Sequence, residues 1–335
     1  MRTIGLTPVN DQSTLTDGFG RRFNYLRLSI TEACNFRCNY CLPEGYCPDT
    51  KEQPLTVDEI RRLVSTMSQL GTLKIRITGG EPTLRKDLVE IVEVCASTPG
   101  IEQVALTSNG YRLAQQLPDL AKAGLTALNL SADSLDPRSF QTITGHDKLT
   151  AVLNALDLST KLGLKTKLNS VLMQSFNANE ISNFVRFVKD RPISLRLIEL
   201  MRTNDNAEFY QQQHVSATGI RDTLINQGWL AQNRSQLAGP AEEFTHADYT
   251  GSIGLIMPYS KNFCADCNRL RIAANGNLHL CLFNEANSNI RRYLGHDENS
   301  AFVDHLQQVV LGKWQGHQLE NNYSGTTSQL AMLGG

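Results

Sequence analysis

The chain has 335 residues, 41% of them hydrophobic, and its 32 basic and 33 acidic residues leave a formal net charge of −1. This length predicts one large domain with an appendage, or two domains. A near-neutral chain creates no overall field that attracts nucleic acid or a membrane, so an anionic ligand must be held by local basic clusters. The first ten residues lack the apolar core of a signal peptide, and no apolar run reaches the about 18 residues of a spanning helix. We therefore expect a cytoplasmic protein with no nucleic-acid or membrane partner.

Short β-type runs alternate with helical ones from about Phe23 to Met201. The expected strands are Asn24–Ile30, Leu73–Thr78, Gln103–Thr107, Ala127–Ser131, Lys165–Leu172 and Leu195–Glu199. The expected helices are Val57–Leu70, Asp87–Ser97, Arg112–Ala123, Ala151–Leu162 and Ala178–Lys189. This alternation predicts a parallel sheet with helices outside it, either an open doubly wound sheet or a (β/α) barrel.

Unusual residues follow the carboxyl ends of these expected strands. They are Cys34, Gly79-Gly80-Glu81, Ser108-Asn109-Gly110, Ser131-Ala132-Asp133, Asn169, Glu199 and Met201. Because such residues follow every expected strand, a site at the mouth of a barrel explains them better than a single crevice in an open sheet. Because six strands fall short of eight, we expect an α/β fold built as an incomplete (β/α)6 TIM-like barrel.

The rest of the chain precedes and follows this expected barrel. Polar residues from about Thr203 to Glu243 predict a connecting segment with one helix. A short β region at Ile253–Met257 and a hairpin turn at Asn275-Gly276-Asn277 follow, and then polar helices lead to Leu333-Gly334-Gly335. We expect an N-terminal arm at 1–20, the barrel at 21–245 and a C-terminal region at 246–335.

Eight cysteines in a chain without a secretion signal indicate metal binding or redox chemistry rather than a disulfide framework. Six of them form the triplets Cys34-x3-Cys38-x2-Cys41 and Cys264-x2-Cys267-x13-Cys281. Three thiolates are one fewer than a four-iron cluster needs, so one iron would stay open to a ligand that is not protein. We interpret Cys47, in a loop, as a bystander and Cys95, in an apolar run, as a small buried hydrophobe.

The first triplet has zinc binding as its alternative, but structural zinc takes four ligands and no histidine lies near this run. With Tyr40 before Cys41, the spacing resembles the C-x3-C-x-aromatic-C motif of the radical S-adenosylmethionine (SAM) superfamily. That resemblance implies a [4Fe–4S] cluster whose open iron binds SAM, and a 5′-deoxyadenosyl radical made from SAM by one electron. Glycines allow close approach to a ligand, and a carboxylate such as that of Glu81 accepts from an ammonium. The SAM contacts that the resemblance implies are Tyr40, Gly79, Gly80, Glu81, Ser131 and Met201.

The second triplet has a structural zinc hairpin as its alternative, with His279 as fourth ligand, since His279 and Cys281 share a face of a strand. Arg269 and Arg271 alternate onto one face beside these cysteines. Arginine forks suit phosphate oxygens, which favours a ligand site over a purely structural metal.

These residues resemble a narrower family, the GTP 3′,8-cyclases of molybdenum cofactor biosynthesis. The likeness covers nearly the whole chain. The motifs that carry it are Asp17-Gly18-Phe19-Gly20-Arg21, Tyr25-Leu26-Arg27-Leu28-Ser29, both cysteine triplets, Lys74-Ile75-Arg76-Ile77-Thr78-Gly79-Gly80-Glu81-Pro82, Ser134-Leu135-Asp136 and the terminal Gly-Gly. Two departures, Ala33 and the segment Gln174-Ser175-Phe176-Asn177, touch no proposed ligand.

The family resemblance implies a second [4Fe–4S] cluster, held by Cys264, Cys267 and Cys281, whose open iron takes the guanine base. It places GTP contacts at Arg27, Arg76, Thr107, Lys167, Arg196, Arg269 and Arg271. The alternative for each cation is pairing with Asp or Glu. No G-x4-G-K-[ST] motif is present, so side-chain cations must hold the triphosphate.

The implied reaction converts GTP to (8S)-3′,8-cyclo-7,8-dihydroguanosine 5′-triphosphate after abstraction of the ribose C3′ hydrogen. In the family, Gly334 and Gly335 would reach the active site with Arg269 and Arg271. The implied partners are an electron donor, a second copy in a homodimer and, for hand-off of product, cyclic pyranopterin monophosphate synthase. Two rival hypotheses are a radical SAM peptide maturase and a zinc-binding interaction module without activity.

Overall fold

The computed structural model describes residues 14–47, 53–285, 287–295, 299–325 and 333. Its strands form one 12-stranded sheet in the order β12-β11-β10-β1-β2-β3-β4-β5-β6-β9-β8-β7. The strands are β1 (Tyr25–Ser29), β2 (Lys74–Thr78), β3 (Gln103–Ser108), β4 (Ala127–Ser131), β5 (Lys165–Leu172), β6 (Ser194–Glu199), β7 (Leu230–Ala231), β8 (Glu242–Thr245), β9 (Ser252–Ile256), β10 (Arg269–Ile272), β11 (Asn277–His279) and β12 (Ser288–Asn289).

The six predicted strands are confirmed as β1 to β6, which run parallel in sequence order. The C-terminal segment adds a parallel strand at each edge of this set, β10 beside β1 and β9 beside β6. Within the described ranges β9 and β10 do not pair with each other. The sheet is therefore an open, curved barrel wall, as expected. Strands β9 and β10 of the C-terminal segment widen it beyond the six predicted parallel strands.

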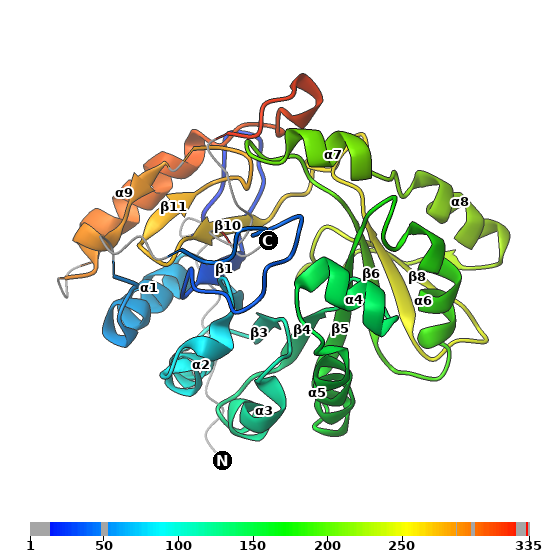
Figure 1. Ribbon diagram of the computed structural model, residues 1–335. Helices are drawn as coiled ribbons and strands as arrows, with labels where there is room; N and C mark the ends of the chain where they lie inside the picture. Colours follow the sequence, from blue (N-terminus) through cyan, green and yellow to red (C-terminus); the bar gives the residue numbers. More distant parts are fainter. Residues whose placement is uncertain (1–13, 48–52, 286, 296–298, 326–332, 334–335) are drawn as a thin grey trace, which may run out of the picture.

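The helices lie mainly on the convex side of this sheet, and α9 lies beside β10 and β11 (Figure 1). They are α1 (Val57–Gln69), α2 (Leu88–Ser97), α3 (Leu113–Lys122), α4 (Pro137–Thr144), α5 (Leu149–Lys161), α6 (Ile181–Phe187), α7 (Ala207–Gln213), α8 (Thr218–Asn226) and α9 (Ser300–Leu311). In the part of the chain that the structure describes, no helix is long and apolar enough to cross a membrane.

The prediction of a single helix between Thr203 and Glu243 is wrong. The structure has two helices there, α7 and α8, and the hairpin strands β7 and β8. Helix α4, which the sequence analysis did not propose, follows β4. These helices are seven to nine residues long, and so short a segment gives few repeats of the apolar period by which a helix is recognised in a sequence.

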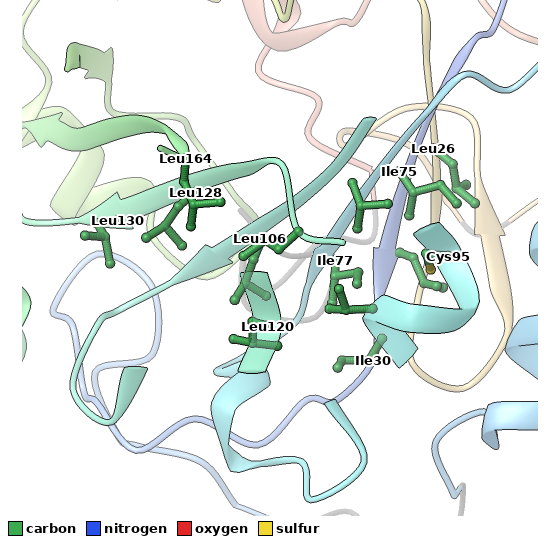
Figure 2. Close-up of a cluster of buried hydrophobic side chains, with 14 of the residues drawn as sticks. Leu26, Ile30, Ile75, Ile77, Cys95, Leu106, Leu120, Leu128, Leu130 and Leu164 are labelled. Carbon is green, nitrogen blue, oxygen red and sulfur yellow. The ribbon is translucent and has the colours of Figure 1, made fainter. Parts of the chain in front are cut away.

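The strands of the barrel wall carry apolar side chains on their outer face and polar ones on their inner face. Leu26, Ile75, Ile77, Leu106 and Leu128 are fully buried and pack among the helix residues of the same core, including Leu120 and Cys95 (Figure 2). Their neighbours in sequence include Arg27, Arg76 and Asn129, which line a cavity instead. Successive side chains of a strand point to opposite faces, so these polar residues, which alternate with the apolar ones, face the inside of the barrel. A polar inner face is unlike the continuous apolar strands of an ordinary buried parallel sheet, and it indicates a ligand site.

Candidate active site

One cavity lies at the carboxyl ends of the strands and gathers the first cysteine triplet with most of the predicted SAM contacts. Tyr40, Gly79, Gly80, Ser131 and Met201 line it together with Cys34, Cys38 and Cys41. Thr107, predicted as a GTP contact, lies in this same lining. The structure therefore brings the residues of four separate sequence motifs to one space.

Gly79 and Gly80 hold the cysteine loop against the end of β2. The Gly80 amide donates to the Thr31 carbonyl at 2.8 Å, and the Glu81 amide donates to the Ala33 carbonyl at 2.7 Å. A Cβ added to either glycine would come within 2.3 Å of a backbone oxygen of that loop. Gly79 also has φ of +150°, which L side chains rarely adopt. Any larger residue would displace the loop that carries Cys34.

Glu81 has a different environment from the one the sequence analysis expected. Its carboxylate is fully buried and does not line the cavity. One oxygen accepts from the Thr83 amide and hydroxyl and from the Ser108 hydroxyl, and the other accepts from the Asn109 amide at 2.7 Å. With its oxygens engaged inside the protein, Glu81 ties the end of β2 to the end of β3, and the ammonium contact predicted for its carboxylate has no support in this geometry.

The first cavity disfavours negative charge on its thiols. Burial, with a contribution from Asp133, raises the pKa of Cys38 well above its usual value, and burial also raises the pKa of Cys34. Burial raises the pKa of Asp133 to about 6, and the Tyr40 hydroxyl donates to this carboxylate at 3.0 Å. Thiolates in such surroundings need a cation to compensate them, and bound metal supplies that charge while releasing the thiol protons. The donor set fits an iron–sulfur cluster.

A second cavity adjoins the first and gathers the other cysteine triplet with the arginines of the barrel. Cys264, Cys267 and Cys281 line it. Residues common to both linings are Asn169, Ile198, Met201 and Leu282. An apolar cluster, made of Ala273, Leu282, Phe283, Leu319 and Leu333, also contacts both Cys41 and Cys281. The two triplets therefore face a shared space.

Arginines dominate the inner surface of the second cavity. Arg27, Arg76, Arg196, Arg269 and Arg271 line it. Burial, together with the charge of Arg271, lowers the pKa of Arg27 well below its usual value, and burial with the charge of Arg269 lowers the pKa of Arg271 to about 10. None of the described acidic side chains forms an ion pair with Arg76, Arg269 or Arg271. Crowded, buried cations cost free energy unless an anion compensates them, so this cavity is suited to a multiply charged anion.

Arg196 and Lys167 follow the other interpretation that the sequence allowed. Arg196 donates to Glu243 at 2.6 Å, and the Lys167 Nζ lies 3.6 Å from the same carboxylate. Lys167 lines a third cavity, which shares Arg76, Asn129 and Arg196 with the second. An incoming anion would therefore compete with Glu243 for these two cations.

Lys74 belongs to one of the family motifs, but no role was predicted for it from the sequence. It lies in β2 two residues before Arg76, lines the third cavity and donates to the Leu237 carbonyl at 3.0 Å. Burial and the charge of Arg76 lower its pKa to about 7. The alternation of β2 could have identified it, because Lys74 and Arg76 share the inner face of that strand.

The second cysteine triplet lies among positive charges. Although burial raises it, the charges of Arg269 and Lys313 bring the pKa of Cys267 down to about 6. Lys313 is buried and donates to the Leu280 carbonyl beside Cys281. Arg21, paired with Asp17 at 2.6 Å, donates to the carbonyl of Cys264 at 3.0 Å. Burial raises the pKa of Cys264, whereas Cys267 favours the thiolate, which is the form that binds metal, so this set also fits a cluster.

The zinc interpretations gain nothing from the geometry. Across the described ranges, no three His, Cys, Asp or Glu side chains converge closely enough to hold a single metal ion. Thiolates of a four-iron cluster bind different irons, so they lie farther apart than the ligands of one ion. His279 is buried opposite Arg271 in the hairpin but does not line the cavity of the cysteines. Of the two remaining cysteines, Cys95 is buried as predicted and Cys47 is exposed.

The C-terminal segment approaches this site. Leu333 is buried in the apolar cluster between the two triplets, and its carbonyl accepts from Arg271 at 3.4 Å. Gly334 and Gly335, predicted to take part in the reaction, lie outside the described residues.

Two family models match the chain. The model described as the Radical SAM superfamily matches residues 28–188, and the one described as Molybdenum Cofactor Synthesis C matches residues 193–319. Among curated relatives, the GTP 3′,8-cyclase of Tolumonas auensis is 51% identical over 96% of this chain and 96% of its own length. That of Pasteurella multocida is 48% identical over the full length of both chains, and that of Yersinia pestis is 49% identical over 96% of this chain and 99% of its own.

Solved structures of the same fold are more distant in sequence. Streptococcus suis SuiB bound to S-adenosylmethionine has a TM-score of 0.62 at 16% identity, covering 86% of this chain and 68% of SuiB. Native anSMEcpe with bound AdoMet and Cp18Cys peptide has a TM-score of 0.56 at 15% identity, covering 84% and 83%. These likenesses identify the fold as that of radical SAM proteins.

Proposed function

Because this chain belongs to the GTP 3′,8-cyclase family of radical SAM enzymes, we propose that it converts GTP to (8S)-3′,8-cyclo-7,8-dihydroguanosine 5′-triphosphate. This is the first step of molybdenum cofactor biosynthesis. The observation that carries the proposal is the pair of adjoining cavities, each lined by three cysteines, of which only the second is lined by a cluster of arginines.

The first cavity would hold SAM and its cluster. Cys34, Cys38 and Cys41 would bind a [4Fe–4S] cluster, and Tyr40, Gly80, Ser131 and Met201 would contact SAM from the surrounding strand ends. Gly79 would act by holding the loop in place. When bound, the cluster and SAM would supply a 5′-deoxyadenosyl radical.

The second cavity would hold GTP. Cys264, Cys267 and Cys281 would bind a second [4Fe–4S] cluster beside the guanine base. The inner-face cations would bind the triphosphate, because an anion is the ligand that relieves their mutual repulsion. The proposed GTP contacts are Arg27, Arg76, Lys167, Arg196, Arg269 and Arg271, with Thr107 at the boundary between the cavities.

The contribution of the chain to the chemistry would be placement. Met201 and Asn169 line both cavities, so a nucleotide anchored in the second presents its ribose toward the first. Held there, the C3′ hydrogen is in reach of a radical formed on the SAM side, and orientation of this kind accounts for a large part of a rate enhancement. The apolar cluster around Leu282 and Leu333 would exclude water from the shared space.

The last two residues are proposed to complete the site. The support for this part is Leu333, which is buried and whose carbonyl accepts from Arg271, an arginine of the second cavity. Deleting Gly334 and Gly335 should abolish cyclase turnover while leaving GTP binding and iron content unchanged. Full activity in the deletion variant would disprove this part.

Further parts of the proposal follow from the family. They are a homodimer, an external one-electron donor and product hand-off to cyclic pyranopterin monophosphate synthase. The cytoplasmic location and the division into 1–20, 21–245 and 246–335, which were expected from the sequence, are also part of the proposal. Sedimentation velocity of the cluster-loaded protein tests the dimer, and a single species of monomer mass would contradict it.

The experiment that tests the function is an anaerobic incubation of cluster-loaded protein with SAM, dithionite and GTP, followed by mass spectrometry. We expect 5′-deoxyadenosine and a nucleotide of the mass of GTP with a new retention time. Cys47→Ser is the matched control, because Cys47 is exposed and belongs to neither triplet. 5′-Deoxyadenosine without a new nucleotide would disprove the substrate, and no 5′-deoxyadenosine at full iron loading would disprove the radical SAM chemistry.

A further inference from the structure

Asn129, on the inner face of β4, is a polar side chain that the protein does not satisfy. It is 1% exposed, and neither its Oδ1 nor its Nδ2 has a hydrogen-bond partner among the described residues. Its side chain lines both the second and the third cavity. An amide buried without partners is costly, and buried polar groups are satisfied in nearly all proteins. The side chain is therefore arranged for a ligand.

The position of Asn129 lies between the two ends of the proposed nucleotide site. Ser131, two residues further along the same face of β4, lines the SAM cavity. In the parallel ladders Asn129 is opposite Thr107 on one side and Lys167 on the other. Two residues of strand span about 7 Å. Asn129 is therefore two strand residues from the cavity proposed for SAM, and it pairs in the sheet with Lys167, a cation proposed to bind the triphosphate.

The chemistry of an amide selects among the parts of a nucleotide. A phosphate has only acceptors, so it would leave the Asn129 carbonyl oxygen unpaired and facing negative charge. A pair of hydroxyls matches the amide, because each hydroxyl both donates and accepts. The guanine edge also has donors and acceptors, but Cys264 and Cys267, proposed to face the base, precede β10, and Cys281 follows β11. Strands β1, β2 and β3 separate β10 from β4 in the sheet.

We propose that Asn129 binds the ribose hydroxyls of the nucleotide and thereby selects ribonucleotides over deoxyribonucleotides. This inference rests on the proposed function, since it concerns the sugar of the same substrate. Holding the hydroxyls fixes the rotation of the sugar, and so determines which ribose carbon faces the SAM cavity. Asn129 is then a residue that positions the substrate as well as one that binds it.

The test is a binding series that does not depend on turnover. Cluster-loaded wild-type protein, Asn129→Ala and Asn129→Leu are titrated anaerobically with GTP, 2′-deoxy-GTP and 3′-deoxy-GTP. We expect the wild type to prefer GTP over at least one deoxy analogue by about 10-fold or more, as sites built to bind a hydroxyl do. Asn129→Ala should bind GTP and that analogue equally. Asn154→Ala, an exposed asparagine of α5, is the matched control.

The ratio of affinities separates a ribose contact from the other possibilities. If Asn129→Ala weakens all three nucleotides equally, the residue acts on the base, the phosphates or the fold, and the inference is overturned. A wild type that does not distinguish the three nucleotides overturns it too. If the alanine variant does not fold, Asn129→Leu decides by the same ratio, because leucine is close to asparagine in size and has no hydrogen-bonding group. Failure of the proposed function would instead be seen as absence of cyclised product in the wild type with its ribose preference intact.

Discussion

The two cysteine triplets have the same number of ligands but opposite electrostatic surroundings. The N-terminal triplet lies near the buried carboxylate of Asp133, and the pKa of Cys38 is raised well above its usual value. The C-terminal triplet lies among Arg269 and Lys313, which bring the pKa of Cys267 down to about 6 against the effect of burial, although burial raises the pKa of Cys264. SAM carries a positive sulfonium and GTP a triphosphate, so each set of surroundings matches one ligand in charge. The comparison indicates that neighbouring charges, and not the thiols, distinguish the two sites.

Removing one thiol from each triplet gives the largest expected effects. Cys38→Ser should lower iron content by about half and reduce 5′-deoxyadenosine formation to background, because one cluster of the two proposed is lost. Cys267→Ser should lose the same amount of iron yet still cleave SAM, while cyclised product falls to background. Iron analysis and product chromatography measure both. If the two variants behave alike, the division of labour between the triplets is wrong.

Arg76 has no carboxylate partner among the described residues, whereas Arg196 is paired with Glu243, so the two arginines can be compared. Arg76→Met should weaken GTP binding by roughly 100-fold, as expected when a buried charge contact is removed. The same change should raise the thermal stability of the free protein, because a buried charge without a carboxylate partner among the described residues is replaced by an apolar side chain.

The matched control for Arg76→Met is Arg196→Met. It leaves Glu243 without its 2.6 Å partner and should destabilise the free protein. Calorimetry of both variants without nucleotide measures the difference, and equal shifts in melting temperature would contradict the role given to Arg76.

The pH dependence of GTP binding tests the charge of the phosphate side. Burial with the charge of Arg76 lowers the pKa of Lys74 to about 7, and burial with that of Arg196 lowers the pKa of Lys167 to about 8. A bound triphosphate favours the protonated lysine, so both pKa values rise on binding and protons are taken up. Affinity should therefore fall as pH rises from about 7 to 9, by up to about 10-fold per pH unit for each proton. Titration calorimetry in buffers of different ionisation enthalpy counts the protons, and Lys74→Met should remove part of the uptake.

Substitutions at Lys313 are expected to have the smallest effect among these tests of the difference between the two cysteine triplets. Lys313→Met removes a buried charge near Cys267 and Cys281 and should make the C-terminal cluster harder to reduce, on the order of tens of millivolts. The N-terminal cluster should not change. Lys313→Arg, which keeps the charge, should restore the potential. Spectroscopic redox titration of each variant measures this, and a shift in both clusters would indicate a general structural effect.

The sequence alone predicted much of the barrel and of the site lining. The six strands were found because alternation and flanking turns are local signals, and the cysteine and glycine motifs were recognisable by spacing. Pairing was not predictable, since β10 beside β1 depends on contacts between opposite ends of the chain. The surroundings of Glu81 could not be inferred either, because Ser108 and Asn109, which bind it, come from another strand end. Asn129 became a candidate only when its burial and its missing hydrogen-bond partners could be seen.

The placement of β10 has a consequence for how this protein is made. Asn268 donates to Asn24 across a separation of 244 residues, at the point where β10 joins β1. During synthesis, the edge of β1 therefore remains without its strand partner until most of the chain has left the ribosome. An unpaired strand edge is prone to associate with other chains, and such long-range pairing forms slowly. We expect chains truncated before β10 to aggregate, and folding of the intact chain to be completed only near the end of translation.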